Sequence, residues 1–261
     1  LERSESTGTR PQIRIITAIN GTVFPMSRTL PMKNNARQSI SADDRAIEHS
    51  TPFYNGALRS EATVGPYHKY LHSTAQSCDS FRDACILGRT WLKQRGFASS
   101  AQHGGFGGFE WGIIMALLLE SGGPGGKPLL SKSYSSYQLF KATMQFISRK
   151  DLTKPMLFFA DGAPDIQFPH GRPVLYDGKR GTNLLYKMSP WSYALLRHDA
   201  ELTLAMLNES RDDNFENVFI VKVDEPMMRF DRLLCLPSLK CCNILESIHH
   251  EFAIYEVVSR A

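Results

Sequence analysis

The sequence has few cysteines and no apolar segment long enough to cross a membrane. Its 261 residues include five cysteines, and none of them belongs to a Cys-x-x-Cys pair. An odd, low count is typical of a reducing compartment and argues against a disulfide framework. The longest apolar run, residues 111–119, is about half of the roughly 20 residues that a spanning helix needs. The sequence therefore predicts no membrane segment.

Metal-binding and targeting signals are also missing. Cys78 and Cys85 are predicted to be buried free thiols on one helix face. Cys241-Cys242 with His249-His250 match no standard zinc-finger spacing, so no metal site is predicted. The chain starts at Leu1 without an initiator Met and without the apolar core of a signal peptide. This start predicts a piece of a longer protein.

Signatures of nucleotide chemistry are incomplete. After Gly105-x-Gly107 a dinucleotide fingerprint needs glycine or alanine at position 110, which is Glu110, and no P-loop Gly-Lys-Ser/Thr follows. Two interpretations of these glycines therefore remain: they allow helices to pack closely, or their backbone N–H groups bind a phosphate. A Gly-Ser followed by Asp-x-Asp, typical of metal-dependent nucleotidyl transfer, is not in the sequence. No catalytic residue and no cofactor are predicted.

The charge balance is only mildly basic. Lys and Arg number 30 against 26 Asp and Glu, which gives a formal net charge of +4. Such an excess supports RNA contact only weakly, because most excesses of this size are simply solvated surface. Several aromatic side chains could stack on bases or pack in a core: Tyr67, Tyr70, Phe106, Tyr134 and Tyr137.

Apolar periodicity predicts a helical centre. A stripe from Phe81 to Leu92 predicts a helix capped by Ser80 and ended by Gly96. The run 109–119 is apolar on all sides, which predicts a helix in the middle of a domain. Further helices are predicted over 136–148 and from Ser189-Pro190 to about residue 207. A final helix is predicted over 239–258.

Short β-type segments flank this centre. Strands are predicted over 12–24 with a turn at Asn20-Gly21, and over 215–223. Residues 156–159 and 173–176 are predicted to be short strands or extended connections, while 31–50 and 121–128 are predicted loops. The predicted fold class is α+β, mainly helical and flanked by strands.

Three consecutive motifs are more specific together than any one alone: FRDACIL at 81–87, WLKQRGF at 91–97 and GGFGGFEW at 104–111. They resemble the helical domain of poly(A) polymerases, oligoadenylate synthetases and archaeal CCA-adding enzymes. In this form they resemble the nucleolar RNA-associated protein family. The resemblance extends over about residues 10–236, with further matches at 51–55, 69–72, 176–184, 222–224 and 229–231.

The resemblance implies a domain order and a function. Residues 1–50 would end a nucleotidyltransferase-like domain, 51–210 would form its helical partner, and 211–261 would return to a sheet or a next domain. The implied function is a non-catalytic scaffold of the nucleolar small-subunit processome. Its implied partners are pre-ribosomal RNA and ribosome-assembly proteins, including a casein kinase 2-containing subcomplex. An active RNA nucleotidyltransferase fragment and a protein-only interaction module remain the alternatives.

The resemblance also implies site residues. An Asp and an Asn near the positions of Asp177 and Asn183 recognise the nucleotide base in active relatives. Together with Gly105 and Gly107 they imply a degenerate nucleotide pocket here. Candidate RNA contacts are five cations: Arg89, Lys93, Arg95, Lys179 and Arg180.

Overall fold

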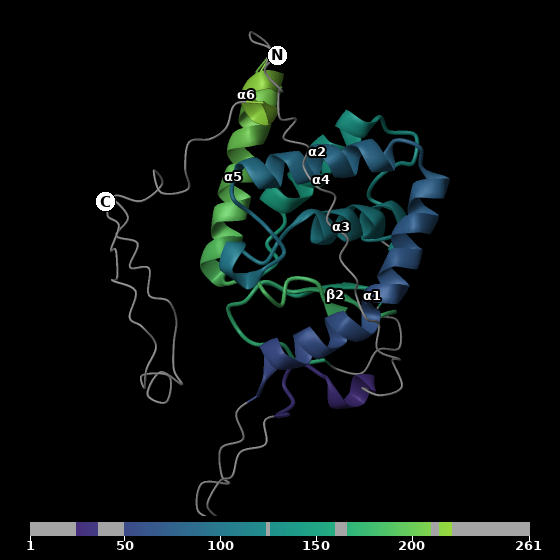
Figure 1. Cartoon of the computed structure of the whole chain (residues 1–261), viewed down its shortest axis with the longest axis vertical. Coiled ribbons are helices and arrows are strands. Elements are labelled where there is room, and N and C mark those ends of the chain that lie inside the picture. Colours follow the sequence, from purple (N-terminus) through teal and green to yellow (C-terminus); the bar gives the residue numbers. More distant parts are fainter. Residues whose placement is uncertain (1–24, 36–49, 124–125, 160–165, 210–213, 221–261) are drawn as a thin grey trace, which may run out of the picture.

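A computed structural model describes residues 25–35, 50–123, 126–159, 166–209 and 214–220 (Figure 1). Its helices are α1 (Pro52–Ser77), α2 (Phe81–Gln94), α3 (Gly108–Glu120), α4 (Ser136–Arg149), α5 (Pro190–Asn208) and α6 (Phe215–Phe219). Short 3-10 helices cover Met26–Arg28 and Ala101–His103. The strands are β1 (Met156–Phe158), β2 (Leu175–Asp177) and β3 (Thr182–Asn183). The predicted α+β class is confirmed. The strand predicted over 12–24 and the helix predicted over 239–258 lie outside the described residues.

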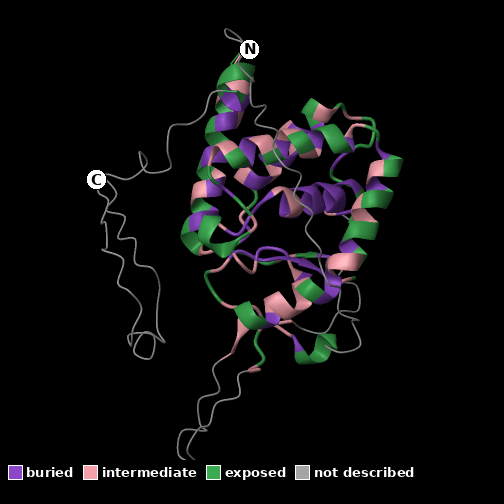
Figure 2. Ribbon diagram, in the orientation of Figure 1, coloured by how far each residue is buried: buried purple, intermediate pink, exposed green. Residues whose placement is uncertain are grey.

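Helix α3 forms the centre of the core, as predicted. Every residue from Glu110 to Leu119 is buried. Its sequence has no polar stripe to face water, so the free energy is lowest when other elements cover it on all sides. Helices α1, α2 and α4 pack against it, and Figure 2 shows it as a continuous buried segment.

Helices α2 and α4 are amphipathic, also as predicted. The buried face of α4 consists of the predicted side chains Leu139, Phe140, Thr143, Met144 and Ile147. Helix α2 ends before Gly96, whose φ of 74° is the left-handed conformation that favours glycine. The predicted Ser80 cap is wrong. Ser80 stands at the N-cap position but already has helical dihedral angles, and its side chain makes no capping bond.

The two cysteines of this region are free thiols, as predicted, but do not share a helix face. Cys78 is buried and lies before α2 begins, while Cys85 lies within α2. Burial raises the pKa of the Cys85 thiol to about 12, which keeps it protonated and unreactive.

A row of aromatic rings joins α2 to α6 through the core. Ring centroids are 6.3 Å apart for Trp91 and Trp111, 5.5 Å for Trp111 and Phe140, and 5.0 Å for Phe140 and Phe219. The Trp91 indole donates to Thr203 Oγ1 of α5 at 2.9 Å. These contacts fix the relative positions of four helices (α2, α3, α4 and α6), and the indole bond adds α5.

Residues 215–219 are helical, which contradicts the predicted strand over 215–223. The adjacent side chains Val218 and Phe219 are both buried. Successive residues of a strand point to opposite faces, whereas on a helix two neighbours can share a packed side. The side chains of Gln94 and Arg95 donate to the carbonyls of Phe219 and Val218, which holds this turn against α2. The remaining positions, 221–223, are outside the described residues.

Helix α1 is the largest element that the sequence did not predict. Pro66 lies in its interior and Gly56 near its start, and both residues normally argue against a helix. Gly56 is needed because a Cβ there would lie 2.5 Å from the Tyr186 ring. Figure 1 shows α1 running from the small sheet along the side of the helical bundle, with a bend part-way. None of the described helices is long and apolar enough to span a bilayer.

The sheet has the strand order β1-β2-β3. Strand β1 is parallel to β2, and β2 is antiparallel to β3. The extended segments predicted at 156–159 and 173–176 correspond to β1 and β2. Strand β3 is only two residues long and was not predicted. Ser189 caps α5 as predicted, because its hydroxyl accepts the Ser192 N–H at 3.0 Å.

Candidate functional site

The residues that resemble a base-recognition loop lie on the hairpin of β2 and β3. Asp177 ends β2 and pairs with Thr182, while Asn183 in β3 pairs with Tyr176. Both positions therefore belong to a regular ladder that packs against α1. The structure brings Asp177 and Asn183 to the same hairpin, as their proximity in the sequence suggests.

The Asp177 carboxylate is fully buried and accepts three hydrogen bonds. Oδ2 accepts from the Tyr67 hydroxyl of α1 at 3.1 Å and from Arg180 Nη1 at 2.6 Å. Oδ1 accepts from the Lys179 N–H at 3.1 Å. Each bond offsets part of the cost of burying a charge. The carboxylate therefore ties α1 to the hairpin and has little capacity left for a ligand.

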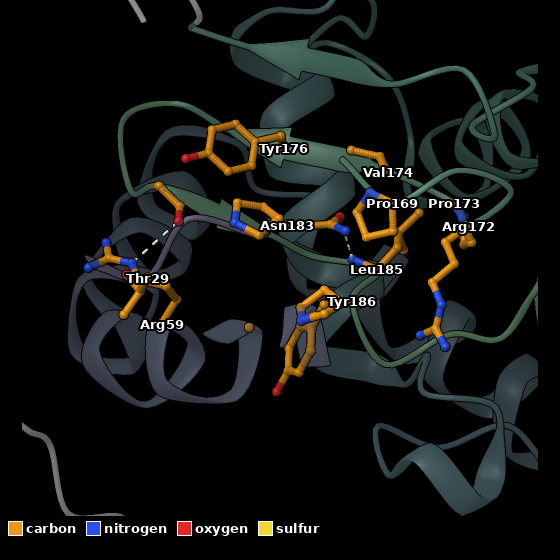
Figure 3. Close-up of a pocket in the computed structure, with 14 residues that line it drawn as sticks. Thr29, Arg59, Pro169, Arg172, Pro173, Val174, Tyr176, Asn183, Leu185 and Tyr186 are labelled. Atoms are coloured by element: carbon orange, nitrogen blue, oxygen red, sulfur yellow. Dashed lines mark hydrogen bonds between the residues drawn. The ribbon is translucent and has the colours of Figure 1, made fainter. Parts of the chain in front are cut away.

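The Asn183 amide is used in the same internal way. Its Oδ1 accepts from the backbone N–H groups of Leu175 and Leu185, both at 3.1 Å. The first bond extends the ladder to β2, and the second starts the turn that follows β3. In Figure 3 the Asn183 side chain points toward Leu185 rather than into open space.

Asn183 also lines a pocket between the hairpin, the start of α1 and the loop before β2 (Figure 3). Other lining side chains include Arg59, Arg172, Tyr176 and Tyr186. The cavity volume is about 30 Å³. That volume corresponds to about one water molecule, whereas ligand pockets usually enclose about 300–1,000 Å³. In this conformation the pocket is too small for a nucleotide.

Arg59 closes one side of this pocket. Its guanidinium donates to the carbonyls of Arg180 and Gly181 in the β2–β3 turn, the latter at 3.3 Å. Burial lowers the pKa of Arg59 from its usual range, with Tyr176 and Tyr67 acting in the opposite direction. The side chain thus fixes the turn to α1.

An aromatic and ionic cluster extends from Asp177 along the inner side of α1. The Arg180 guanidinium lies 4.1 Å from the Tyr70 ring centroid and 5.0 Å from that of Tyr67. Burial, followed by the Asp177 carboxylate, raises the pKa of Tyr67 far above its ordinary value. Burial also raises the pKa of Tyr70, with a contribution from Glu120. Both phenols are therefore neutral donors at any physiological pH.

Glu120 at the end of α3 completes this cluster. Lys179 Nζ lies 2.6 Å from Glu120 Oε1 and 3.6 Å from the Phe159 ring centroid. Partial burial acts to raise the pKa of Glu120, but hydrogen bonds from Lys179 and Tyr70 outweigh it and lower that pKa. The pair is half exposed, so its contribution to stability is small.

The glycine-rich segment before α3 is occupied by the protein's own carboxylate. Glu110 is buried, and its Oε2 accepts the Gly107 N–H at 2.9 Å and the Ser99 hydroxyl. Lys187 Nζ lies 3.3 Å from Oε1. Gly107 has no side chain to complete a reciprocal capping box, so only the carboxylate half of that motif is present. An anion thus already sits at this helix start.

The glycines themselves permit close packing. A Cβ on Gly105 would lie 2.7 Å from Lys187 Cβ, and one on Gly107 would lie 2.5 Å from Ser99 Oγ. Gly105 also has a φ of 70°, in the left-handed region. These contacts agree with the packing interpretation of the segment. Gly105 and Gly107 are not among the residues that line the pocket of Figure 3.

The five candidate RNA-contacting cations divide into two groups. Arg180 bonds to Asp177, Lys179 pairs with Glu120, and the Arg95 guanidinium lies 4.7 Å from the Trp91 ring centroid. Arg89 and Lys93 are exposed on α2 and form no ion pair with any described residue. The cations of the first group are therefore engaged with other side chains, whereas Arg89 and Lys93 are exposed on α2.

Sequence reasoning missed the roles of Tyr67, Arg59 and Glu110. Tyr67 and Asp177 are 110 residues apart in the chain, so no local pattern links them. Glu110 did carry a signal, because an acid three residues after a helix-capping position is typical of a capping interaction. Within the described ranges, no three His, Cys, Asp or Glu side chains gather as metal ligands do.

The fold and these motifs define a class of protein, namely helical domains like those of poly(A) polymerases and oligoadenylate synthetases. A family described as the Nrap protein PAP/OAS-like domain matches residues 80–222, and Nrap protein domain 1 matches residues 2–77. The chain belongs to the nucleolar RNA-associated protein (Nrap) family.

Curated relatives from fungi and animals match most of the chain. U3 small nucleolar RNA-associated protein 22 of Saccharomyces cerevisiae is 34% identical over 96% of this chain, and that of Schizosaccharomyces pombe is 34% identical over 89%. Human nucleolar protein 6 is 26% identical over 83%. The chain spans about a fifth of the length of these relatives: 22%, 21% and 19%. Their names indicate that the family is nucleolar.

Proposed function

We propose that this chain is part of a non-catalytic scaffold that acts in ribosome biogenesis in the nucleolus. Membership of the Nrap family supports the process and the location, since the relatives are named for the nucleolus and for U3 small nucleolar RNA. The observation that carries the non-catalytic part is the internal use of Asp177 and Asn183 beside a cavity of about 30 Å³.

In this proposal the nucleotidyltransferase-like shape is kept for assembly. The groups that resemble a base-recognition loop, Asp177 and Asn183, hold the hairpin and α1 together. Gly105 and Gly107 let the segment before α3 pack closely, with Glu110 in the place that a phosphate would take. The polar groups of these residues are used for internal contacts, on the hairpin and separately at the start of α3.

The proposed domain order follows the resemblance. Residues 1–50 end a nucleotidyltransferase-like domain, 51–210 form the helical partner domain, and 211–261 lead into the next sheet or domain. The tie between α1 and the hairpin supports treating residues 51–210 as one packed unit.

The competing proposal is an active RNA nucleotidyltransferase. Its metal-binding carboxylates would belong to a part of the longer protein that precedes these residues. The test is to titrate ATP with Mg²⁺ into the full-length protein by calorimetry and to assay primer extension on the same sample. We expect neither saturable binding nor extension. Extension that needs Mg²⁺ would refute the scaffold proposal.

The proposed partners are pre-ribosomal RNA and ribosome-assembly proteins, including a casein kinase 2-containing subcomplex. The family resemblance supports this part, and the U3 RNA in the names of the fungal relatives supports the RNA. An RNA-binding assay on the full-length protein tests the alternative of a protein-only interaction module, which predicts no RNA binding. Binding that weakens with salt indicates phosphate contacts, because such contacts release counterions.

A further inference from the structure

The outer face of α2 carries a stripe of cations that form no ion pair with any described residue. Arg82, Ile86, Arg89 and Lys93 are all exposed, whereas Phe81, Ala84, Gly88, Trp91 and Leu92 are buried on the opposite side. At 100° per residue the four exposed positions fall within an arc of about 60°, and they extend about 16 Å along the helix. Figure 2 shows exposed and buried residues alternating along α2. The stripe thus lies on one face of the helix.

The stripe is rigidly presented. Gly88 lets α2 approach Trp111 so closely that a Cβ would lie 2.2 Å from Trp111 Cε2. Trp91 is anchored to Thr203 of α5 at 2.9 Å. Arg89 lies over the start of α3, where a Cβ on Gly108 would be 3.0 Å from Arg89 Cγ. A helix held on its inner face by this core cannot easily turn its cations away.

Its charges have no partner among the described residues. The ion pairs in that part of the structure involve Lys179, Arg180 and Lys187, and none involves the three cations of the stripe. Nearby on α1, His68 and Lys69 are exposed, and the His68 ring lies 5.9 Å from that of Phe109 next to Gly108. His68 of α1 therefore lies beside the start of α3, which the Arg89 side chain also approaches.

We propose that the α2 stripe binds the phosphodiester backbone of RNA, independently of base sequence. This inference rests on the proposed RNA-binding function and names the surface that performs it. Three cations spread over about 16 Å complement a polymer with regularly repeated negative charges. Specific readout of bases would require stacking aromatics or amides, and the stripe has neither.

An acidic protein helix fits this surface less well. A helix that docks in this way buries several apolar anchors spaced at i, i+3 or i+4, and i+7. On α2 the exposed large apolar side chain is Ile86 alone, 59% exposed. One such anchor without a surrounding pocket provides little apolar burial, so charge dominates the stripe.

The test compares variants of the full-length protein binding a fluorescent 30-nucleotide oligouridine at several KCl concentrations. The triple variant Arg82→Gln, Arg89→Gln, Lys93→Gln should weaken binding about tenfold or more at low salt. Loss of three phosphate contacts should also reduce the slope of log K against log salt by about 2. The same loss is expected with oligoadenylate, because the contacts do not read bases.

A matched control removes equal charge elsewhere. The variant Lys132→Gln, Lys150→Gln, Lys154→Gln changes three exposed lysines outside α2. It should retain both the affinity and the slope of the unaltered protein. Equal losses in both variants would mean diffuse electrostatics and would overturn the inference.

The remaining outcomes separate the inference from the function on which it rests. If the unaltered protein binds RNA and the α2 variant binds equally, the inference fails and RNA binding stands. If the α2 variant retains RNA but loses co-purifying assembly proteins, the stripe is a protein contact and the inference fails. If the unaltered protein does not bind RNA at all, both the inference and the proposed RNA contact fail.

Discussion

Replacing Asp177 with alanine should loosen the contact between α1 and the β2–β3 hairpin. The substitution removes the acceptor for the Tyr67 hydroxyl, for Arg180 Nη1 at 2.6 Å and for the Lys179 N–H. It also leaves the Arg180 guanidinium between two aromatic rings without its counter-ion. The perturbation therefore affects a buried ionic network and not a ligand contact.

The structure sets the size of the effect. Breaking a buried ion pair by removing one partner costs about 3–5 kcal/mol. The Arg180 side chain is 16% exposed, so its charge can partly regain water and the cost should lie near about 3 kcal/mol. Asp177→Asn keeps an acceptor oxygen but loses the charge, and should cost about 1–2 kcal/mol. The stability of the protein should therefore increase in the order Asp177→Ala, Asp177→Asn, unaltered protein.

Hydrogen exchange in the full-length protein measures the loss of stability at individual segments. Amides of residues 66–75 and 174–185 should exchange roughly a hundredfold faster in Asp177→Ala, since each 1.4 kcal/mol is about tenfold. Amides of α4, which does not contact Asp177, serve as the internal control and should not change. Unchanged exchange near the hairpin, combined with lost nucleotide binding, would refute the structural role and favour base recognition.

Three further predictions concern packing, capping and pH. Gly88→Ala should lower the free energy of unfolding by about 1–3 kcal/mol, because the new Cβ would overlap the Trp111 ring. Gly112→Ala is the control and should leave that free energy unchanged, because the nearest atom to its Cβ would be 3.5 Å away. Thermal unfolding of the two variants tests the difference. Glu110→Ala should cost about 1–3 kcal/mol and speed exchange at the start of α3, and unchanged exchange there would contradict the capping role. The folded-state pKa of Glu120 is lowered, so its stabilisation should be present above its ordinary pKa of 4.5 and lost as pH falls through the folded value. The stability difference between the unaltered protein and Glu120→Gln should therefore vanish in acid, and a difference that persists there would contradict this account.

The local sequence determined the elements whose patterns repeat over several turns. The buried face of α4, the fully apolar α3 and the Ser189 cap of α5 all follow from spacing within one element. The motifs at 81–111 were enough to indicate the family, because they combine an amphipathic helix, a stop at Gly96 and a glycine-rich turn in one order. Such signals involve residues a few positions apart, which is why they can be read without a structure.

Contacts between distant residues decided the rest. Gly56 and Pro66 argue against α1 locally, but packing against Tyr186 and the α3 core stabilises that helix all the same. Residues 215–219 form a helix because α2 offers a surface for Val218 and Phe219 together.

The candidate site was decided in the same way. By residue type alone, Asp177 is suited to a nucleotide pocket and the cations of α2 are suited to an RNA-binding surface. Tertiary structure turned Asp177 inward, toward Tyr67 of α1, and left Arg89 and Lys93 outside. The sequence determined which charges exist, and only the fold determined which of them are neutralised internally, because the ion-pair partners of Lys179 and Lys187 lie 59 and 77 residues away in the chain.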